Sequence, residues 1–180
     1  MSEGSPLKAL PRHIEPRKFA GQSVSIAGQV PSDQLARLAG EGVSAGQIDA
    51  HLEFGFDDEK HRVVTGKITA ELQVECQRCL ESMALPVDVA VAWAIVWDEE
   101  QAKKLPSRLE PWIAGEGSED LYVMVEEELL LALPTAPMHN SDCLPAELLV
   151  AGESDEPVEP EKNSPFGALA ALKGKIEPKN

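Results

Sequence analysis

The chain has 180 residues and carries 31 Asp and Glu against 16 Lys and Arg, which gives a formal charge of −15. This length predicts one domain, or one domain with tails. Phosphate polymers and anionic lipids repel such an acidic protein. The charge therefore disfavours non-specific wrapping of DNA or RNA and binding to a membrane through a basic helix.

Targeting signals are not evident in the sequence. No run approaches the ~20 apolar residues that a membrane span needs, and residues 1–6 do not start a signal peptide. The three cysteines are an odd number without a secretory context, which argues against a disulfide framework. We therefore expect a cytoplasmic protein, and we consider metal binding and redox chemistry for its cysteines before a disulfide framework.

The first 20 residues form the first predicted segment. Pro6, Pro11 and Pro16 interrupt any helix, and the local charge is mildly basic. We assign residues 1–20 to a loose N-terminal arm. An ordered loop packed on the sheet is the equally valued alternative.

A sheet is the clearest prediction. Apolar and polar residues alternate over residues near 23–30, 47–57, 62–76 and 83–97, and period two indicates strands with one buried face. Because the connections between the last three runs are short, neighbouring strands should be antiparallel. The fold class is therefore α+β, with a twisted antiparallel sheet of about four strands.

One main helix is predicted to cover this sheet. Residues 119–133 place apolar side chains at helical spacing, and Pro134 follows. Short extra helices are expected after Pro31 and near 98–104, followed by a loop. The run Glu126–Glu128 fits a solvated helix face better than an acidic functional patch. Residues 21–150 form the expected single domain.

The C-terminal part has a different composition. Residues 151–163 are polar, acidic and proline-containing, which predicts a flexible, disordered linker. Residues 164–180 should contain a short helical motif with Pro165 at its start and Phe166, Leu169 and Leu172 as anchors. These anchors would dock either on the protein's own sheet or in a groove of a partner.

The candidate chemistry lies in the cysteines. Cys76 and Cys79 form a Cys-x-x-Cys pair between two predicted strands, which is half of a zinc knuckle. His139 and Cys143, after the main helix, have plausible spacing for the other half. Together they would make a closed, structural zinc site. A redox dithiol and plain free thiols remain alternatives, although redox pairs usually precede a helix.

Other chemistry is not indicated. The sequence has no glycine-rich phosphate loop and no Gly-x-Ser-x-Gly motif, so nothing argues for an enzyme. Arg78, between the two cysteines at the tip of a hairpin, is the candidate for contact with a phosphate or an acidic partner.

The order of these motifs resembles a known family. Residues 76–79 close a strand, Leu121–Glu128 leads into Leu133-Pro134, then come Pro137-Met138-His139 and Cys143, and Ser164-Pro165-Phe166 precedes Lys173. This arrangement, from about Val24 to Lys173, resembles the YceD family of large ribosomal RNA subunit accumulation proteins. The resemblance implies a bacterial cytoplasmic factor for synthesis, processing or stability of that RNA. It implies no known catalysis, and it suggests a metal site at Cys76, Cys79 and Cys143.

A charge of −15 must be reconciled with ribosome biogenesis. One explanation, slightly favoured, is an acidic surface that holds a basic ribosomal protein or assembly factor in the manner of a chaperone. The other is RNA contact through a local patch near Arg78, Lys67 and the N-terminal arm. A Cys-x-x-Cys redox protein fits less well than either.

Overall fold

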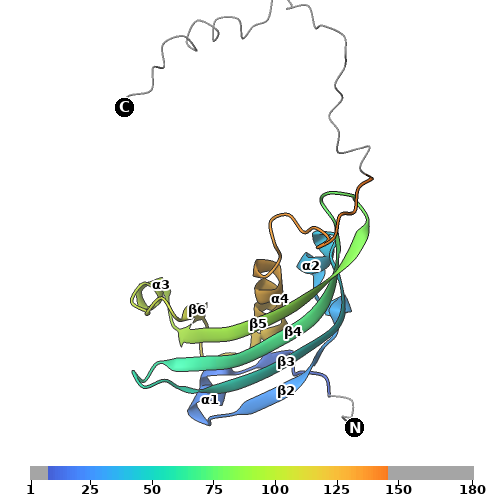
Figure 1. Ribbon diagram of the computed structural model, residues 1–180. Helices are drawn as coiled ribbons and strands as arrows, with labels where there is room; N and C mark the ends of the chain where they lie inside the picture. Colours follow the sequence, from blue (N-terminus) through green and yellow to red (C-terminus); the bar gives the residue numbers. More distant parts are fainter. Residues whose placement is uncertain (1–7, 146–180) are drawn as a thin grey trace, which may run out of the picture. The chain divides into compact units, whose positions relative to one another are not determined.

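The computed structural model describes residues 8–145 and shows a curved five-stranded sheet (Figure 1). The strand order is β2-β3-β4-β5-β6, and the first four strands are antiparallel neighbours. This confirms an α+β fold with a mostly antiparallel sheet. Their bounds are Ser25–Val30 (β2), Ser44–Phe56 (β3), Arg62–Glu75 (β4), Ser82–Val96 (β5) and Glu110–Ile113 (β6).

The expected count of four strands is wrong, because β6 adds a fifth. After β5 the chain forms the short helix α3 (Glu99–Ala102) and returns so that β6 lies parallel to β5. Pro111 within β6 led us to expect a loop here. A proline lacks an N–H group, but an edge strand tolerates that loss on its outer side.

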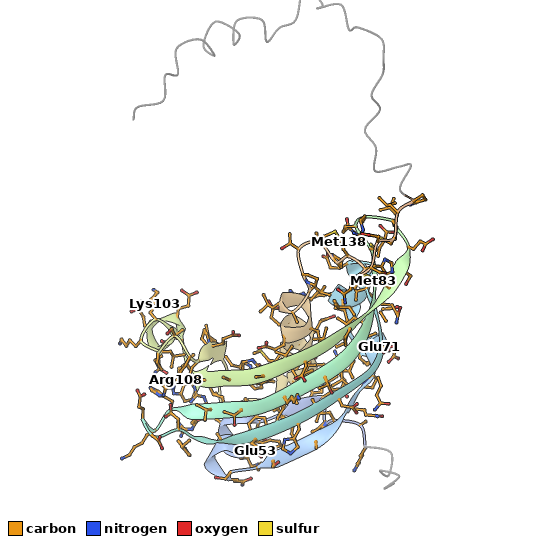
Figure 2. All side chains as sticks on the ribbon, in the orientation of Figure 1. Glu53, Glu71, Met83, Lys103, Arg108 and Met138 are labelled. Atoms are coloured by element: carbon orange, nitrogen blue, oxygen red, sulfur yellow. The ribbon has the colours of Figure 1, made fainter. Side chains whose placement is uncertain are left out.

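The long strands give the sheet two separate ends. The β4–β5 connection, residues 76–81, lies at one end, and the β3–β4 turn lies with α3 at the other (Figure 1). Figure 2 shows Met83 and Met138 at the first end and Lys103 and Arg108 at the second.

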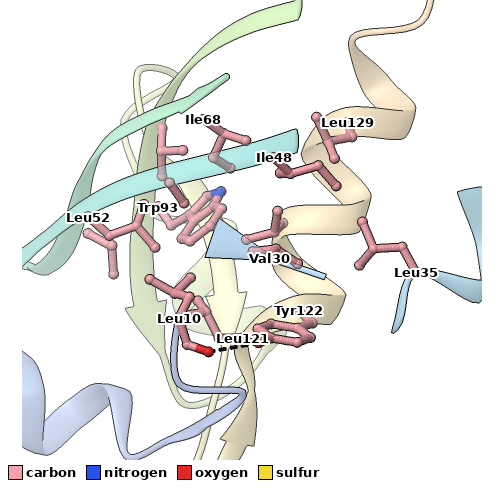
Figure 3. Close-up of a cluster of buried hydrophobic side chains, with 14 of the residues drawn as sticks. Leu10, Val30, Leu35, Ile48, Leu52, Ile68, Trp93, Leu121, Tyr122 and Leu129 are labelled. Atoms are coloured by element: carbon pink, nitrogen blue, oxygen red, sulfur yellow. Dashed lines mark hydrogen bonds between the residues drawn. The ribbon is translucent and has the colours of Figure 1, made fainter. Parts of the chain in front are cut away.

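The predicted main helix is α4 (Leu121–Leu131), the longest of the described helices. Its buried residues Leu121, Val125 and Leu129 pack with sheet residues such as Ile48 and Trp93 in one core (Figure 3). Asp120 caps the helix by accepting a hydrogen bond from the Tyr122 amide. The other helices are α1 (Pro16–Gly21), α2 (Ala36–Gly40), α3 and the 3-10 turn Ser32–Gln34.

The acidic run on α4 is not the solvated face that the sequence indicates. Glu126 is 5% exposed, and its Oε1 atom accepts hydrogen bonds from the amides of Arg37 at 2.8 Å and Leu38 at 3.0 Å. Glu128 is 8% exposed and accepts a hydrogen bond from the Trp93 indole at 2.5 Å. Glu127 does remain half exposed and pairs with Arg37. Glu126 and Glu128 are therefore structural acceptors.

The described part of the N-terminal segment is ordered and packed. Leu10 donates to the Gln29 carbonyl at 2.8 Å, and Gln29 donates to the Lys8 carbonyl at 3.0 Å, so residues 8–10 lie along β2. Gly28 permits this approach, since a Cβ there would lie 2.4 Å from the Lys8 oxygen. Proline at the first position of α1 starts that helix rather than preventing it.

Two short strands then connect this segment to α4. Strand β1 (His13–Ile14) pairs antiparallel with β7 (Glu119–Asp120). Beside them the Tyr122 hydroxyl donates to the Leu10 carbonyl at 2.7 Å (Figure 3).

The predictions for the linker at 151–163 and the motif at 164–180 lie outside the described residues. None of the described helices has the length and apolar character that crossing a membrane takes.

Candidate metal centre

The Cys-x-x-Cys motif forms a tight knuckle between β4 and β5. The Cys76 amide donates to the Glu81 carbonyl at 2.9 Å, and the Leu80 amide donates back to the Cys76 carbonyl at 2.8 Å. Leu80 adopts a φ of 61°, a left-handed conformation that reverses the chain. Both cysteine side chains are thereby directed to one side of the hairpin tip.

The second half of the site comes from the segment after α4. The Gln77 amide donates to the Pro137 carbonyl at 2.8 Å, which fastens this segment to the knuckle. The hydrogen bond places His139 and Cys143 beside Cys76 and Cys79. The predicted convergence of the four residues is therefore confirmed.

The distances match a tetrahedral site. One ligand atom from each of the four residues lies within 4.8 Å of all the others. The Cys76 and Cys143 sulfurs are 3.8 Å apart, and the Cys79 sulfur is 3.4 Å from His139 Nδ1. Tetrahedral zinc with Zn–S bonds of about 2.3 Å and Zn–N bonds of about 2.0 Å requires S–S separations of about 3.8 Å and S–N separations of about 3.5 Å.

The surroundings of Cys76 favour its thiolate. Burial raises the pKa of this thiol, but the backbone amides of Cys79, Arg78 and His139 donate to the sulfur and lower the pKa to about 5. Cys76 is fully buried, so these amides take the place of water.

Cys79 behaves in the opposite way. The Glu81 amide lowers its pKa, but burial and the neighbouring Cys143 and Cys76 raise it to about 11. Thiolates this close repel one another, and a cation among them would remove the repulsion. The opposite pKa shifts of the two thiols indicate that a positive charge between them would be stabilised.

The sequence suggests that Arg78 is exposed at the hairpin tip, but in the structure its side chain is mostly covered. Its side chain is 28% exposed and turns toward the segment after α4. Its Nε atom donates to the Cys143 sulfur at 3.0 Å, and its guanidinium also donates to the carbonyls of His139 and Ser141. Contact of Arg78 with a phosphate or an acidic partner stays a prediction, while the structure gives the residue a bracing position inside the site.

The geometry offers little to a redox dithiol. Thiol–disulfide exchange needs an accessible thiolate, whereas Cys76 is 0% exposed. A strand, not a helix, follows the knuckle. The remaining predicted contacts, Pro165, Phe166, Leu169 and Leu172, lie beyond the described part of the chain.

The spacing of the cysteines in the sequence did not predict the hydrogen bonds that hold the two halves of the site together. The Pro137 carbonyl and the contacts of Arg78 depend on the return of the chain from the end of α4 to the tip of a hairpin formed some 60 residues earlier. The one available signal was the position of Arg78 within the turn, which could equally face solvent.

Fold and site together define a class of protein: a small α+β domain whose sheet carries a cluster of three cysteines and one histidine at one end. Comparison with known proteins identifies the family to which the chain belongs. The family model described as "Large ribosomal RNA subunit accumulation protein YceD" matches residues 64–173. The chain belongs to the YceD family, which confirms the resemblance noted in its sequence.

One curated relative has the same description. It is a large ribosomal RNA subunit accumulation protein YceD from Haemophilus influenzae, 36% identical over 170 residues that span 92% of this chain and 97% of the relative. No solved structure shows a significant match to the chain.

Proposed function

We propose that the chain is a non-enzymatic factor that supports the synthesis, processing or stability of large-subunit ribosomal RNA. The carrying observation is the match over 92% of the chain to a relative described as an accumulation protein for that RNA. The cysteine cluster supports a structural part, since four ligands close a tetrahedral site and leave no position for a substrate. This function would place the protein in the cytoplasm, where bacterial ribosomal RNA is made.

The cluster fits zinc as its ion. Thiolate and imidazole ligands in a tetrahedral arrangement are typical of zinc, and Cys76 carries a pKa low enough for a thiolate at neutral pH. Cys76, Cys79, Cys143 and His139 Nδ1 would hold the ion. Bound zinc would supply a cross-link between the hairpin tip and the segment after α4.

Depletion of the protein in cells tests the function. Mature large-subunit RNA should fall while small-subunit RNA stays nearly unchanged, and a plasmid-borne wild-type copy should restore the balance. Equal loss of both RNAs would indicate a general growth defect and contradict the proposal.

The charge of −15 favours a second candidate, an acidic chaperone for a basic ribosomal protein or assembly factor. Such a partner would compete with RNA for the same protein. Affinity capture at two salt concentrations, analysed for RNA and protein, separates the candidates. Capture of a basic protein that weakens steeply with salt, without RNA, would favour the chaperone.

The C-terminal residues are part of the proposal as a partner motif, with Pro165, Phe166, Leu169 and Leu172 as anchors. Deletion of residues 164–180 should then abolish RNA accumulation and leave the Tm unchanged. A lowered Tm would instead favour docking of this segment on the sheet.

A further inference from the structure

A basic cavity of about 370 Å³ lies at the end of the sheet opposite the cysteines. Its cations come from separate segments: Arg17 on α1, Lys60 in the β3–β4 turn, Arg62 at the start of β4 and Lys104 after α3. No aspartate or glutamate lines the cavity within the described residues. In a chain with a charge of −15, such a local surplus of positive charge is unexpected.

These cations are also free of ion pairs. In the part of the chain that the structure describes, none of Arg17, Lys60, Arg62 and Lys104 forms a salt bridge with a carboxylate. The acidic Asp57 nearby is already engaged by His61 and Arg108. The four positive charges are therefore available to an anion.

Arg17 is held rigidly and has an unused donor. Its Nε atom donates to the Ala114 carbonyl at 2.8 Å, and its guanidinium lies 3.5 Å from the centre of the Trp97 ring. Its Nη2 atom is buried and has no hydrogen-bond partner among residues 8–145. Burial and then the charge of Arg62 lower the pKa of Arg17, whereas Glu116 raises it. An anion between the two arginines would relieve their repulsion.

Aromatic surface adjoins these charges. Trp97 lines the cavity and is 47% exposed, and Arg62 lies over Phe56, which is 51% exposed. Positive charge beside exposed aromatic rings is the combination that binds single-stranded nucleic acid, where cations contact phosphates and rings stack on bases. The cavity is at the small end of ligand sites, and it suits one nucleotide rather than a duplex.

We propose that this cavity binds a nucleotide of single-stranded RNA, with its phosphate among Arg17, Arg62 and Lys104 and its base beside Trp97. The inference rests on the proposed function, which selects RNA, and deepens it by naming a direct contact. It also explains how an acidic protein binds RNA, since a local cavity concentrates positive potential that the rest of the surface lacks.

Matched double variants test the proposal on the full-length protein. Arg62→Gln with Lys104→Gln removes two cavity cations from β4 and the end of α3. Lys67→Gln with Lys103→Gln removes two cations from the same elements outside the cavity, where they pair with Asp88 and Glu100. Figure 2 shows the position of Lys103. Both variants change the net charge equally.

The readout is fluorescence anisotropy with a short, labelled oligouridylate. We expect the cavity variant to weaken RNA binding at least about tenfold and to reduce the slope of log K against log salt by about 1.4, or roughly 0.7 for each lost phosphate contact. The control variant should change affinity less than about twofold. A charge-conserving variant, Arg62→Lys with Lys104→Arg, should restore binding and shows that loss is not misfolding.

Several outcomes would overturn the inference. Equal weakening by both double variants would mean a diffuse charge effect, and no weakening by either would exclude the cavity. Binding of uridine monophosphate or inorganic phosphate as tightly as the oligonucleotide would indicate a small-anion site, and preference for a phosphorylated peptide would indicate a protein partner. A wild-type protein that ignores RNA refutes this inference alone, because depletion tests the proposed function separately.

Discussion

The two ends of strand β4 each lie beside a cluster of chemically similar side chains, but the chemistry of the two clusters differs. Arg62 starts the strand in a cluster of unpaired cations, and Cys76 follows its last residue in a cluster of thiols. With a rise of about 3.4 Å per residue, the path along the strand between the two clusters is about 48 Å. Each end brings together side chains that repel one another when they carry like charges.

The two clusters differ in the sign of the ion that would stabilise them. At the cysteine end the crowded groups are thiols and thiolates, so a cation would complete the site. At the Arg62 end they are guanidinium and ammonium groups, so an anion would complete it. If both proposals hold, the cysteine cluster would stabilise the fold through a bound cation, whereas the cavity around Arg62 would bind a ligand from solvent.

The largest expected effect concerns the metal site proposed at the cysteine end. Cys76→Ser should reduce zinc content, measured by mass spectrometry of the purified protein, from full occupancy to near zero. Because zinc would cross-link two distant segments, the Tm should fall by roughly 10 °C. His139→Ala should act in the same direction, and His51→Ala, at an exposed position on β3, serves as its control.

Hydrogen exchange shows whether this loss stays local. In Cys76→Ser, exchange should accelerate in residues 76–81 and 137–143 and remain unchanged in residues 57–62 and 94–97. Uniform acceleration would mean that the two ends are one cooperative unit, and the comparison would fail.

A second effect concerns α4, which lies between the two ends. Glu126→Ala should destabilise the protein by about 2–4 kcal/mol, because the buried amides of Arg37 and Leu38 lose a charged acceptor. Chemical denaturation measures this change. Glu127→Ala, the next residue, loses only an exposed pair with Arg37 and should have little effect. Similar losses in both variants would argue against the capping position of Glu126.

A third prediction tests whether the N-terminal residues that pack on Gly28 also hold Arg17 in the basic cavity. Gly28→Ala should cost about 1–3 kcal/mol, since the new Cβ would clash with the backbone of Lys8 and Leu10. Gly55→Ala on β3 meets open space and is the control. If displaced residues 8–10 also shift α1 and Arg17, RNA affinity should fall in Gly28→Ala. Unchanged affinity would mean that α1 holds its place independently.

The smallest effect is a pH dependence from Glu128. Burial raises the pKa of Glu128, the Trp93 indole lowers it and Glu110 raises it, with a net increase. A raised pKa in the folded state means that this carboxyl stabilises the fold at low pH and loses that contribution as the pH rises.

Glu128→Gln should therefore gain stability relative to the wild type between about pH 4 and pH 7. Thermal unfolding across this range measures the gain, and Glu127→Gln should show none. A variant that loses stability relative to the wild type as the pH rises from 4 to 7 would reverse the assigned direction.

Periodicity was enough to predict the long strands and α4, because their buried faces repeat at two and 3.6 residues. It could not reveal β6, whose four residues include a proline, or α1, whose proline is also a helix start. Glu126 and Glu128 looked solvated because a sequence does not show that α2 and Trp93 cover them.

The two sites also differ in how far the sequence alone could predict them. Three cysteines and a histidine with knuckle spacing are rare enough to predict their convergence from sequence. Arg17, Lys60, Arg62 and Lys104 are ordinary residues from distant segments, and only the curved sheet brings them to one cavity. The net charge of −15 gave no sign of such a site, because total charge does not describe local charge.

The hydrogen bond from Tyr122 to Leu10 has a consequence for synthesis on the ribosome. The two residues are 112 positions apart, and Arg12 and Asp120 form an ion pair beside them. Residues 8–14 leave the exit tunnel well before their partners at the start of α4, which emerge only after all five strands. Residues 8–10 can pair with β2 early, but their contacts with α4 must wait, and contacts of such long range are slow to form. Completion of α4, rather than of the sheet, sets the moment at which the domain closes.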